Sequence, residues 1–84
     1  MVDREAVKSK ILDIVGPFSR DQEALRAATG ESRLLEDLKI NSARLVDIVL
    51  EMEDAFRIEI GDDDADRVRT VGDAVEVVAG KMAA

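Results

Sequence analysis

Apolar residues recur at helical spacing from the start of the chain. A helix is predicted from about Asp3 to Val15, and one of its faces carries Val7, Ile11, Ile14 and Val15. Asp3 can cap the start of this helix. Gly16 and Pro17 end it, because proline cannot continue the hydrogen-bond ladder of a helix.

The clearest pattern lies between Ser42 and about Phe56, where a second helix is predicted with Asn41 or Ser42 at its cap. Its apolar stripe follows the spacing i, i+4, i+7 and i+11, at Leu45, Val49, Met52 and Phe56. Val46 and Ile48 widen this stripe. The outer face is polar and carries Asp47, Glu51 and Asp54 together with Arg44.

Two further helices are predicted near the C-terminus. A short one, capped by Asp62 or Asp63, reaches about Val68. Thr70 and Asp73 have the spacing of a capping box, with aspartate in the place of the usual glutamate. The helix that they open runs to about residue 82 and packs one face inward, with Val71, Ala74, Val75, Val78 and Met82.

The segment of residues 17–40 shows no sustained period, and it is long for a connection in a small domain. Asp21 to Ala28 can form a turn or two of helix, and the later part can attach to a core through Leu34, Leu35 and Leu38. Three longer helices, one short helix and this long first loop predict an all-α fold. We expect a small antiparallel four-helix bundle in which residues 1–84 form a single domain.

The composition excludes several kinds of chemistry. The chain has 84 residues and contains neither cysteine nor histidine, so it offers no disulfide, no protein thiol and no Ser-His-Asp or Cys-His arrangement. We therefore expect no catalytic residues and no enzymatic activity from the chain itself. The N-terminal residues are charged where a secretory signal needs an apolar run, and no stretch is apolar enough to span a membrane. These features predict a cytoplasmic protein.

Negative charge is concentrated in one short segment. The net charge is −7, yet residues 1–46 hold eight acidic and eight basic side chains. Residues 47–66 hold nine acidic side chains and one arginine. Such a segment repels nucleic acid and attracts basic protein surfaces, so we expect no nucleic-acid partner. A merely solvated acidic face is the alternative interpretation.

The acidic run at residues 62–66 superficially resembles a calcium-binding loop. Arg67 occupies the sixth position, where such a loop needs glycine, and Asp73 occupies the twelfth, where a longer glutamate is usual. No metal site is therefore predicted here, only a solvated acidic turn that binds divalent cations weakly, if at all.

Ser42 stands where the long loop meets the best-formed amphipathic helix. A serine at this place presents its hydroxyl at the surface, and an attached phosphate would be favoured by the positive end of the helix dipole and by unpaired N–H groups. The simpler interpretation is that Ser42 only caps the helix. The serine alone favours this simpler interpretation, so its neighbours must decide.

The surroundings of Ser42 resemble the signature region of acyl carrier proteins. The resemblance is carried by the run from Leu34 to Ser42 and by the apolar and acidic helix from Leu45 to Phe56. It continues through residues 58–60, the acidic turn at 62–64 and the run at 67–74. The match is close from about residue 34 onward, whereas the first helix matches only in pattern.

The resemblance implies that Ser42 is the attachment site of a covalent 4′-phosphopantetheine cofactor. A phosphopantetheinyl transferase would move this arm from coenzyme A to Ser42 Oγ, and the thiol of the arm would carry acyl groups as thioesters. The apolar faces of the second and third helices would shelter the acyl chain between visits to enzymes. The carrier would serve fatty-acid, polyketide or other specialised acyl biosynthesis.

The resemblance also implies how partners dock. In the family, acidic side chains on the second helix bind basic patches of acyl-loading and acyl-processing enzymes. By position, Asp47, Glu53 and Asp54 would do so here, with Arg44 beside them. We expect the carrier to be a monomer.

Some positions depart from the family pattern. Asn41 replaces the usual aspartate before the serine, Ala43 replaces leucine after it, and Gly61 stands where proline is frequent. Arg44 is positive where an acid is common. The lost negative charge and the added positive charge should weaken docking to enzymes that serve the common pattern, so we expect a specialised carrier.

Two other functions remain open at this point. An aminoacyl or peptidyl carrier has the same fold and arm, but often a glycine-rich lead-in to the serine and fewer acids. The sequence Lys39-Ile40-Asn41 and the many acidic residues favour acyl cargo. An unmodified helical interaction module would use Ser42 only as a cap and its acidic surface to bind a basic protein.

Overall fold

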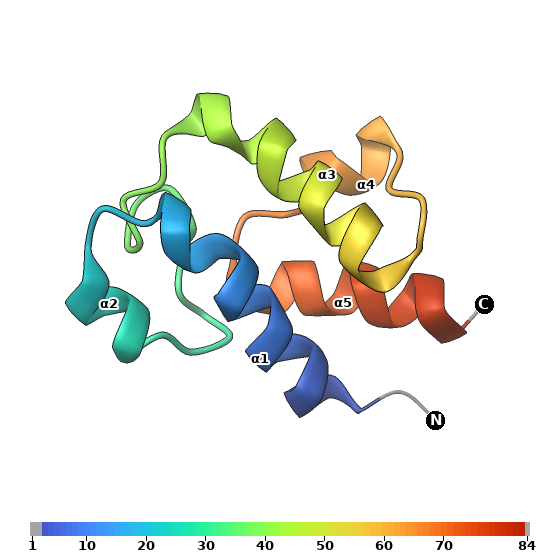
Figure 1. Ribbon diagram of the computed structural model, residues 1–84, viewed down its shortest axis with the longest axis horizontal. Coiled ribbons are helices and arrows are strands. Elements are labelled where there is room, and N and C mark those ends of the chain that lie inside the picture. The colour runs from blue at the N-terminus through green and yellow to red at the C-terminus, as the bar shows by residue number, and fades with distance from the viewer. Residues whose placement is uncertain (1–2, 84) are drawn as a thin grey trace.

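The computed structural model describes residues 3–83, and this part of the chain is mostly helical. The α-helices are α1 (Arg4–Val15), α2 (Gln22–Arg26), α3 (Leu45–Phe56), α4 (Asp62–Asp66) and α5 (Val71–Ala83). Helix α1 packs antiparallel to α5 and α3, and the short helices α2 and α4 lie at the edges (Figure 1). The expected all-α bundle with a long first loop is confirmed. No helix in the described part of the chain has the length and apolar content needed to span a bilayer.

Helix α1 begins and ends where the sequence predicts. Asp3 Oδ1 accepts hydrogen bonds from the Glu5 and Ala6 N–H groups at 3.0 and 3.3 Å, which satisfies donors that have no partner within the helix. The inner face buries Val7, Ile11 and Val15, whereas Ile14 is half-buried. After Val15 the chain tightens into a 3₁₀ turn, Gly16–Phe18, because Pro17 fits the first turn of a helix but cannot extend one.

Helix α3 starts at Leu45, and the prediction that it starts at Ser42 is wrong. Ser42–Arg44 form a 3₁₀ turn instead, and Arg44 N donates to Asn41 O at 2.8 Å. The predicted stripe is only partly buried, because Ile48 and Met52 lie in the core while Val46 is 66% exposed. Val46 lies on the solvent side of the helix, where Leu50 follows it one turn later.

Helix α4 is also corrected by the structure. Its cap is Gly61, not Asp62 or Asp63, and these two aspartates lie in the first helical turn. Carboxylates are favoured at this position by the helix dipole, so they stabilise the turn without capping it. The helix ends at Asp66, before the expected end near Val68.

Helix α5 opens with the predicted capping box. Asp73 N donates to Thr70 Oγ1 at 3.0 Å, and Thr70 N donates to Asp73 Oδ2 at 3.1 Å. The inner face is buried as expected, with Val71, Ala74, Val75 and Val78. Met82 is the exception, because it is 45% exposed and borders a shallow groove beside Ala6 and Phe56 instead of lying in the core.

Backbone hydrogen bonds attach the long first loop to the start of α5. Leu34 N donates to Arg69 O at 3.0 Å, Val71 N to Ser32 O at 3.0 Å, and Gly72 N to Gly30 O at 2.7 Å. The loop then buries Leu34, Leu38 and Ile40 in the core, whereas Leu35 stays 40% exposed. The segment without a helical period is therefore ordered by main-chain pairing and by three apolar anchors.

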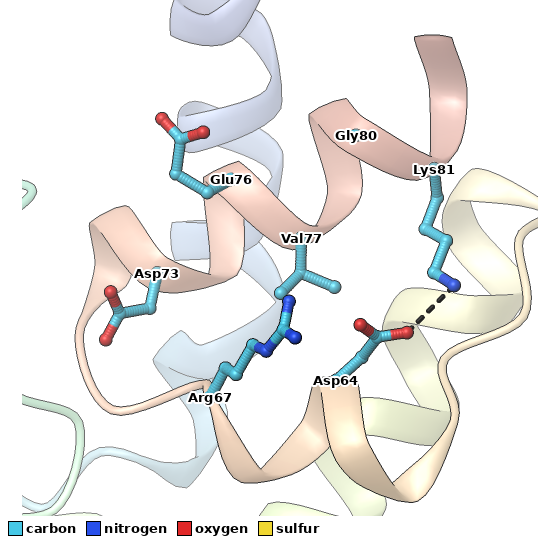
Figure 2. Close-up of a pocket in the computed structure, with 7 residues that line it drawn as sticks. All are labelled: Asp64, Arg67, Asp73, Glu76, Val77, Gly80 and Lys81. Carbon is cyan, nitrogen blue, oxygen red and sulfur yellow. Dashed lines mark ion pairs between the residues drawn. The ribbon is translucent and has the colours of Figure 1, made fainter. Parts of the chain in front are cut away.

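Charged side chains fasten the short helix α4 to α5. Lys81 Nζ lies 2.8 Å from Asp64 Oδ2, at the edge of a pocket of about 520 Å³ between the two helices (Figure 2). The hydrogen bond from Lys81 lowers the pKa of Asp64 below its ordinary value, which burial alone would raise. Asp64 thus forms an ion pair with Lys81 that joins α4 to α5.

The close approach of the loop to α5 predicts opposite effects for two glycines of the same helix. A Cβ at residue 72 would lie 2.8 Å from Gly30 O, whereas a Cβ at residue 80 would meet no heavy atom within 4 Å. Gly72→Ala should lower the free energy of unfolding by about 1–3 kcal/mol. Gly80→Ala should raise it by up to about 1 kcal/mol, because alanine favours the helix. Urea unfolding measures both, and equal effects would contradict the tight loop contact.

The Asp64–Lys81 pair predicts a stability difference that depends on pH. The pKa of Asp64 is lowered in the folded chain. The ion pair therefore contributes to the free energy of unfolding above the ordinary aspartate pKa of about 4, and this contribution is lost as the pH falls through the lowered pKa. Lys81→Gln should slightly decrease the free energy of unfolding at neutral pH, and this decrease should vanish in strong acid. Lys8→Gln is the control for loss of positive charge. A decrease that persists unchanged in acid would argue against the pair.

Candidate functional site

Ser42 lies at the surface, at the start of the 3₁₀ turn that leads into α3. The side chain that caps this turn belongs to Asn41, whose Oδ1 accepts a hydrogen bond from Ala43 N at 2.9 Å. The Ser42 carbonyl accepts from Leu45 N, which continues the chain into the α-helix. Ser42 is an exposed residue, and its hydroxyl is not required for the turn because Asn41 caps it.

The backbone before Ser42 is held by a buried serine from the first loop. Ser19 is only 8% exposed, and its Oγ donates to Leu38 O at 2.7 Å. Arg20 N donates to the same carbonyl at 3.2 Å. Lys39 then adopts a left-handed conformation with φ 56°, and Ile40 returns to the core. The segment that leads to Ser42 is therefore held in place by hydrogen bonds to Leu38 O and by the burial of Ile40.

The predicted docking residues fall into two groups. Asp47 and Asp54 lie two helical turns apart on the outer side of α3, with Glu51 between them. Arg44 pairs with the first of these acids, because its Nη1 lies 3.1 Å from Asp47 Oδ2. Asp47, Asp54 and Arg44 thus lie along one face that begins at the Ser42 turn.

Glu53 lies on a different side of α3 and has a structural contact. Its Oε2 accepts a hydrogen bond from Ile60 N at 2.7 Å, and the residue is half-buried. Ile60 is a core residue in the connection to α4. The Glu53 carboxylate therefore satisfies a partly buried backbone donor and holds this connection in place.

An apolar groove of about 470 Å³ runs between α3 and α4. Its walls include Val46, Leu50 and Val49 from α3, and Ala65 and Val68 from the α4 region. Val46 and Leu50 are 66% and 56% exposed, which is unusual for large apolar side chains. The helical pattern assigns Val46 to the apolar stripe, and the structure corrects this. Val46 and Leu50 are spaced i, i+4 on the polar side of α3, and this spacing is the sequence signal for the exposed pair.

Within residues 3–83, no group of three or more carboxylates is arranged to hold a metal ion. The acidic segment at residues 62–66 instead forms the whole of the short helix α4. Asp64 faces Lys81 across the pocket shown in Figure 2, and Arg67 lies beside it. This part of the surface is thus an ion-paired contact between helices.

The sequence and the fold both match known proteins. The chain is 35% identical to the acyl carrier protein of Lactobacillus acidophilus over 78 residues, which cover 92% of this chain and 94% of that protein. It is 36% identical to the acyl carrier protein of Syntrophobacter fumaroxidans over 84 residues, covering 99% and 100%. The acyl carrier protein of Thermotoga maritima is 33% identical over 82 residues, covering 98% and 99%.

A solved structure agrees with these relatives. The acyl carrier protein of Enterococcus faecalis superposes with a TM-score of 0.77 and 31% identity, covering 95% of this chain and 99% of that one. No protein-family model matches the chain. Acyl carrier proteins are carriers and not enzymes, and they generally bear phosphopantetheine. Because the relatives match at 33% to 36% identity over nearly their full length and the fold is shared, this chain belongs to the acyl carrier protein family.

Proposed function

We propose that this protein carries acyl groups on a 4′-phosphopantetheine arm attached to Ser42 Oγ. The observation that carries the proposal is that Ser42 is exposed on a turn that Asn41 caps in its place. A modifying enzyme must reach the hydroxyl from outside, and an exposed residue at a helix entrance permits this approach. The phosphopantetheinyl transferase that adds the arm would be the first partner.

The residues around Ser42 fit this prosthetic group. A phosphate on Ser42 would lie near the positive end of α3, where the dipole favours negative charge. The arm supplies a terminal thiol that bonds acyl groups as thioesters, a function for which the chain has no residue of its own, since it lacks cysteine. The exposed serine, the helix entrance and the missing thiol are thus mutually consistent.

The apolar groove between α3 and α4 provides the proposed shelter for an acyl chain. Val46 and Leu50 are already exposed at its mouth, and each methylene removed from water contributes about 0.8 kcal/mol. The groove lies along the same helix that begins beside Ser42, so a tethered chain would reach it without leaving the protein.

Partner enzymes would dock on the outer face of α3. Asp47, Glu51 and Asp54 form a line of acids there, and contacts with basic patches would be fast, weak and sensitive to salt. The ion pair between Arg44 and Asp47 neutralises the first acid of α3. This arrangement supports a carrier that serves a specialised set of acyl-loading and acyl-processing enzymes.

Intact mass spectrometry tests the attachment. The purified protein and Ser42→Ala are incubated with coenzyme A and a broad-specificity phosphopantetheinyl transferase. The wild type should gain one phosphopantetheine and Ser42→Ala should gain none, because the only change is the loss of Oγ. A wild type that stays unmodified, or a variant that gains the same mass, would refute the proposal. Circular dichroism checks that the variant is folded.

A second experiment separates docking acids from the structural acid. Glu53→Ala should lower the free energy of unfolding by about 1–2 kcal/mol, because Ile60 N loses its acceptor. Glu53→Gln should retain most of the stability, since its amide oxygen can accept the same bond. The neighbouring exposed Asp54→Ala should change the free energy by less than about 0.5 kcal/mol.

Urea unfolding of the three variants gives these values. If Glu53→Ala and Asp54→Ala lose equally little, the bond from Ile60 N to Glu53 does not hold the connection in place.

A further inference from the structure

A positively charged cleft lies beside Ser42, and it shares no lining residue with the apolar groove. It encloses about 520 Å³ and is lined by Pro17, Phe18, Arg20, Asn41 and Arg44. Two of these five residues are arginines and none is acidic, although the whole chain has a net charge of −7. Two guanidinium groups on one small depression form a site for an anion, because each presents several N–H donors in a planar fork.

The cleft is built by parts of the chain that are far apart in sequence. Pro17 and Phe18 come from the 3₁₀ turn after α1, and Asn41 and Arg44 come from the turn that opens α3. The buried Ser19 hydroxyl joins the two sides through its 2.7 Å bond to Leu38 O. Arg20 N bonds the same carbonyl, so the backbone at Arg20 is held beside the Ser42 segment.

The guanidinium groups of Arg20 and Arg44 have N–H donors that no carboxylate in residues 3–83 occupies. Arg44 uses Nη1 for Asp47 at 3.1 Å, which leaves its other N–H groups for a second acceptor. Arg20 forms no ion pair with any carboxylate within residues 3–83. Both side chains are exposed, so their long stems can turn toward a ligand at the mouth of the cleft.

We propose that Arg20 and Arg44 bind the phosphodiester of an arm attached to Ser42, and so fix the root of that arm on this side of the turn. This proposal rests on the proposed function, because it needs the arm. Ser42 lies next to Asn41 and two residues before Arg44, and both of these line the cleft. A phosphate on Oγ would therefore be tethered at the edge of the cleft, at a high effective concentration.

A tethered phosphate suits the cleft better than a carboxylate from a partner enzyme. The tether removes most of the entropic cost of bringing the anion to the site, whereas a partner must bear that cost at every encounter. Phosphate oxygens also match the two-pronged donor geometry of arginine. The arrangement would hold the phosphate while the rest of the arm stays free to move.

A thermodynamic cycle tests the contact directly. Apo and arm-bearing forms of the wild type, Arg20→Gln, Arg44→Gln and the double variant are unfolded with urea at low salt. Attachment of the arm should raise the folded-to-unfolded ratio of the wild type about two- to fivefold more than that of the double variant. High salt should abolish this difference. Each apo variant is the reference for its own arm-bearing form, so a general loss of stability cancels.

Arg26→Gln is the matched control, because Arg26 is an exposed arginine on α2 that does not line the cleft. It should behave like the wild type. The ³¹P chemical shift of the arm-bearing protein is a second readout that does not depend on stability. It should move in Arg20→Gln and Arg44→Gln and stay unchanged in Arg26→Gln.

The outcomes are distinct. Equal stabilisation in all forms together with an unchanged ³¹P shift would overturn the phosphate contact while leaving the carrier function intact. If those results held and the double variant were loaded slowly by acyl-processing enzymes, the cleft would bind an acidic group of the partner instead. Intact masses of the same samples report the arm itself, and a wild type without it would overturn both proposals.

Discussion

The hydrogen bonds between the first loop and the start of α5 determine where Ser42 stands. Gly72 N, Val71 N and Leu34 N tie the two segments together over a short stretch, and Gly30 O lies so close to Gly72 that a Cβ at residue 72 would be only 2.8 Å from it. A loop of this length would otherwise lose much conformational entropy on ordering with few apolar contacts in return. Once it is tied, Ile40 N bonds Leu34 O at 3.1 Å, and the chain reaches Asn41 from a fixed point.

Three surfaces of different chemistry meet around the Ser42 hydroxyl. The cleft with Arg20 and Arg44 is positive, the outer face of α3 is negative, and the groove with Val46 and Leu50 is apolar. A phosphodiester, a basic protein surface and an acyl chain are the three kinds of group that a carrier has to accommodate. Each surface suits one of them, and the turn at Ser42–Arg44 lies where the three surfaces meet.

The longer helices could be predicted because their signals are local. The spacing of apolar residues defined α1 and most of α3, and the pair Thr70 and Asp73 located the start of α5 through bonds that span three residues. The cap at Asn41 was one of the two predicted, but the start of α3 was missed because Ser42–Arg44 form a 3₁₀ turn, which the spacing of apolar residues does not distinguish from the first turn of an α-helix.

The remaining features depend on contacts that no local pattern contains. Lys39 and Arg57 adopt left-handed conformations although neither is glycine, so their residue types gave no indication. The contact of Gly30 with Gly72 joins positions far apart in the chain. The cleft was missed for the same reason, because Arg20 and Arg44 line it from segments that are far apart in the sequence, and the buried bond of Ser19 to Leu38 O joins these segments.

Arg44 belongs to both charged surfaces and changes where unpaired negative charge lies on the acidic one. Its Nη1 pairs with Asp47 and its side chain also lines the cleft, so one guanidinium would serve both a phosphate on Ser42 and the first acid of α3. The unpaired negative charge then begins later along the helix, toward Glu51 and Asp54. Asp54 lies seven residues beyond Asp47, which is about 10 Å along a helix axis. On the proposed function, a basic patch of a partner would engage α3 at Glu51 and Asp54, which lie nine and twelve residues beyond Ser42, and this displacement would give the proposed partner specificity a physical basis.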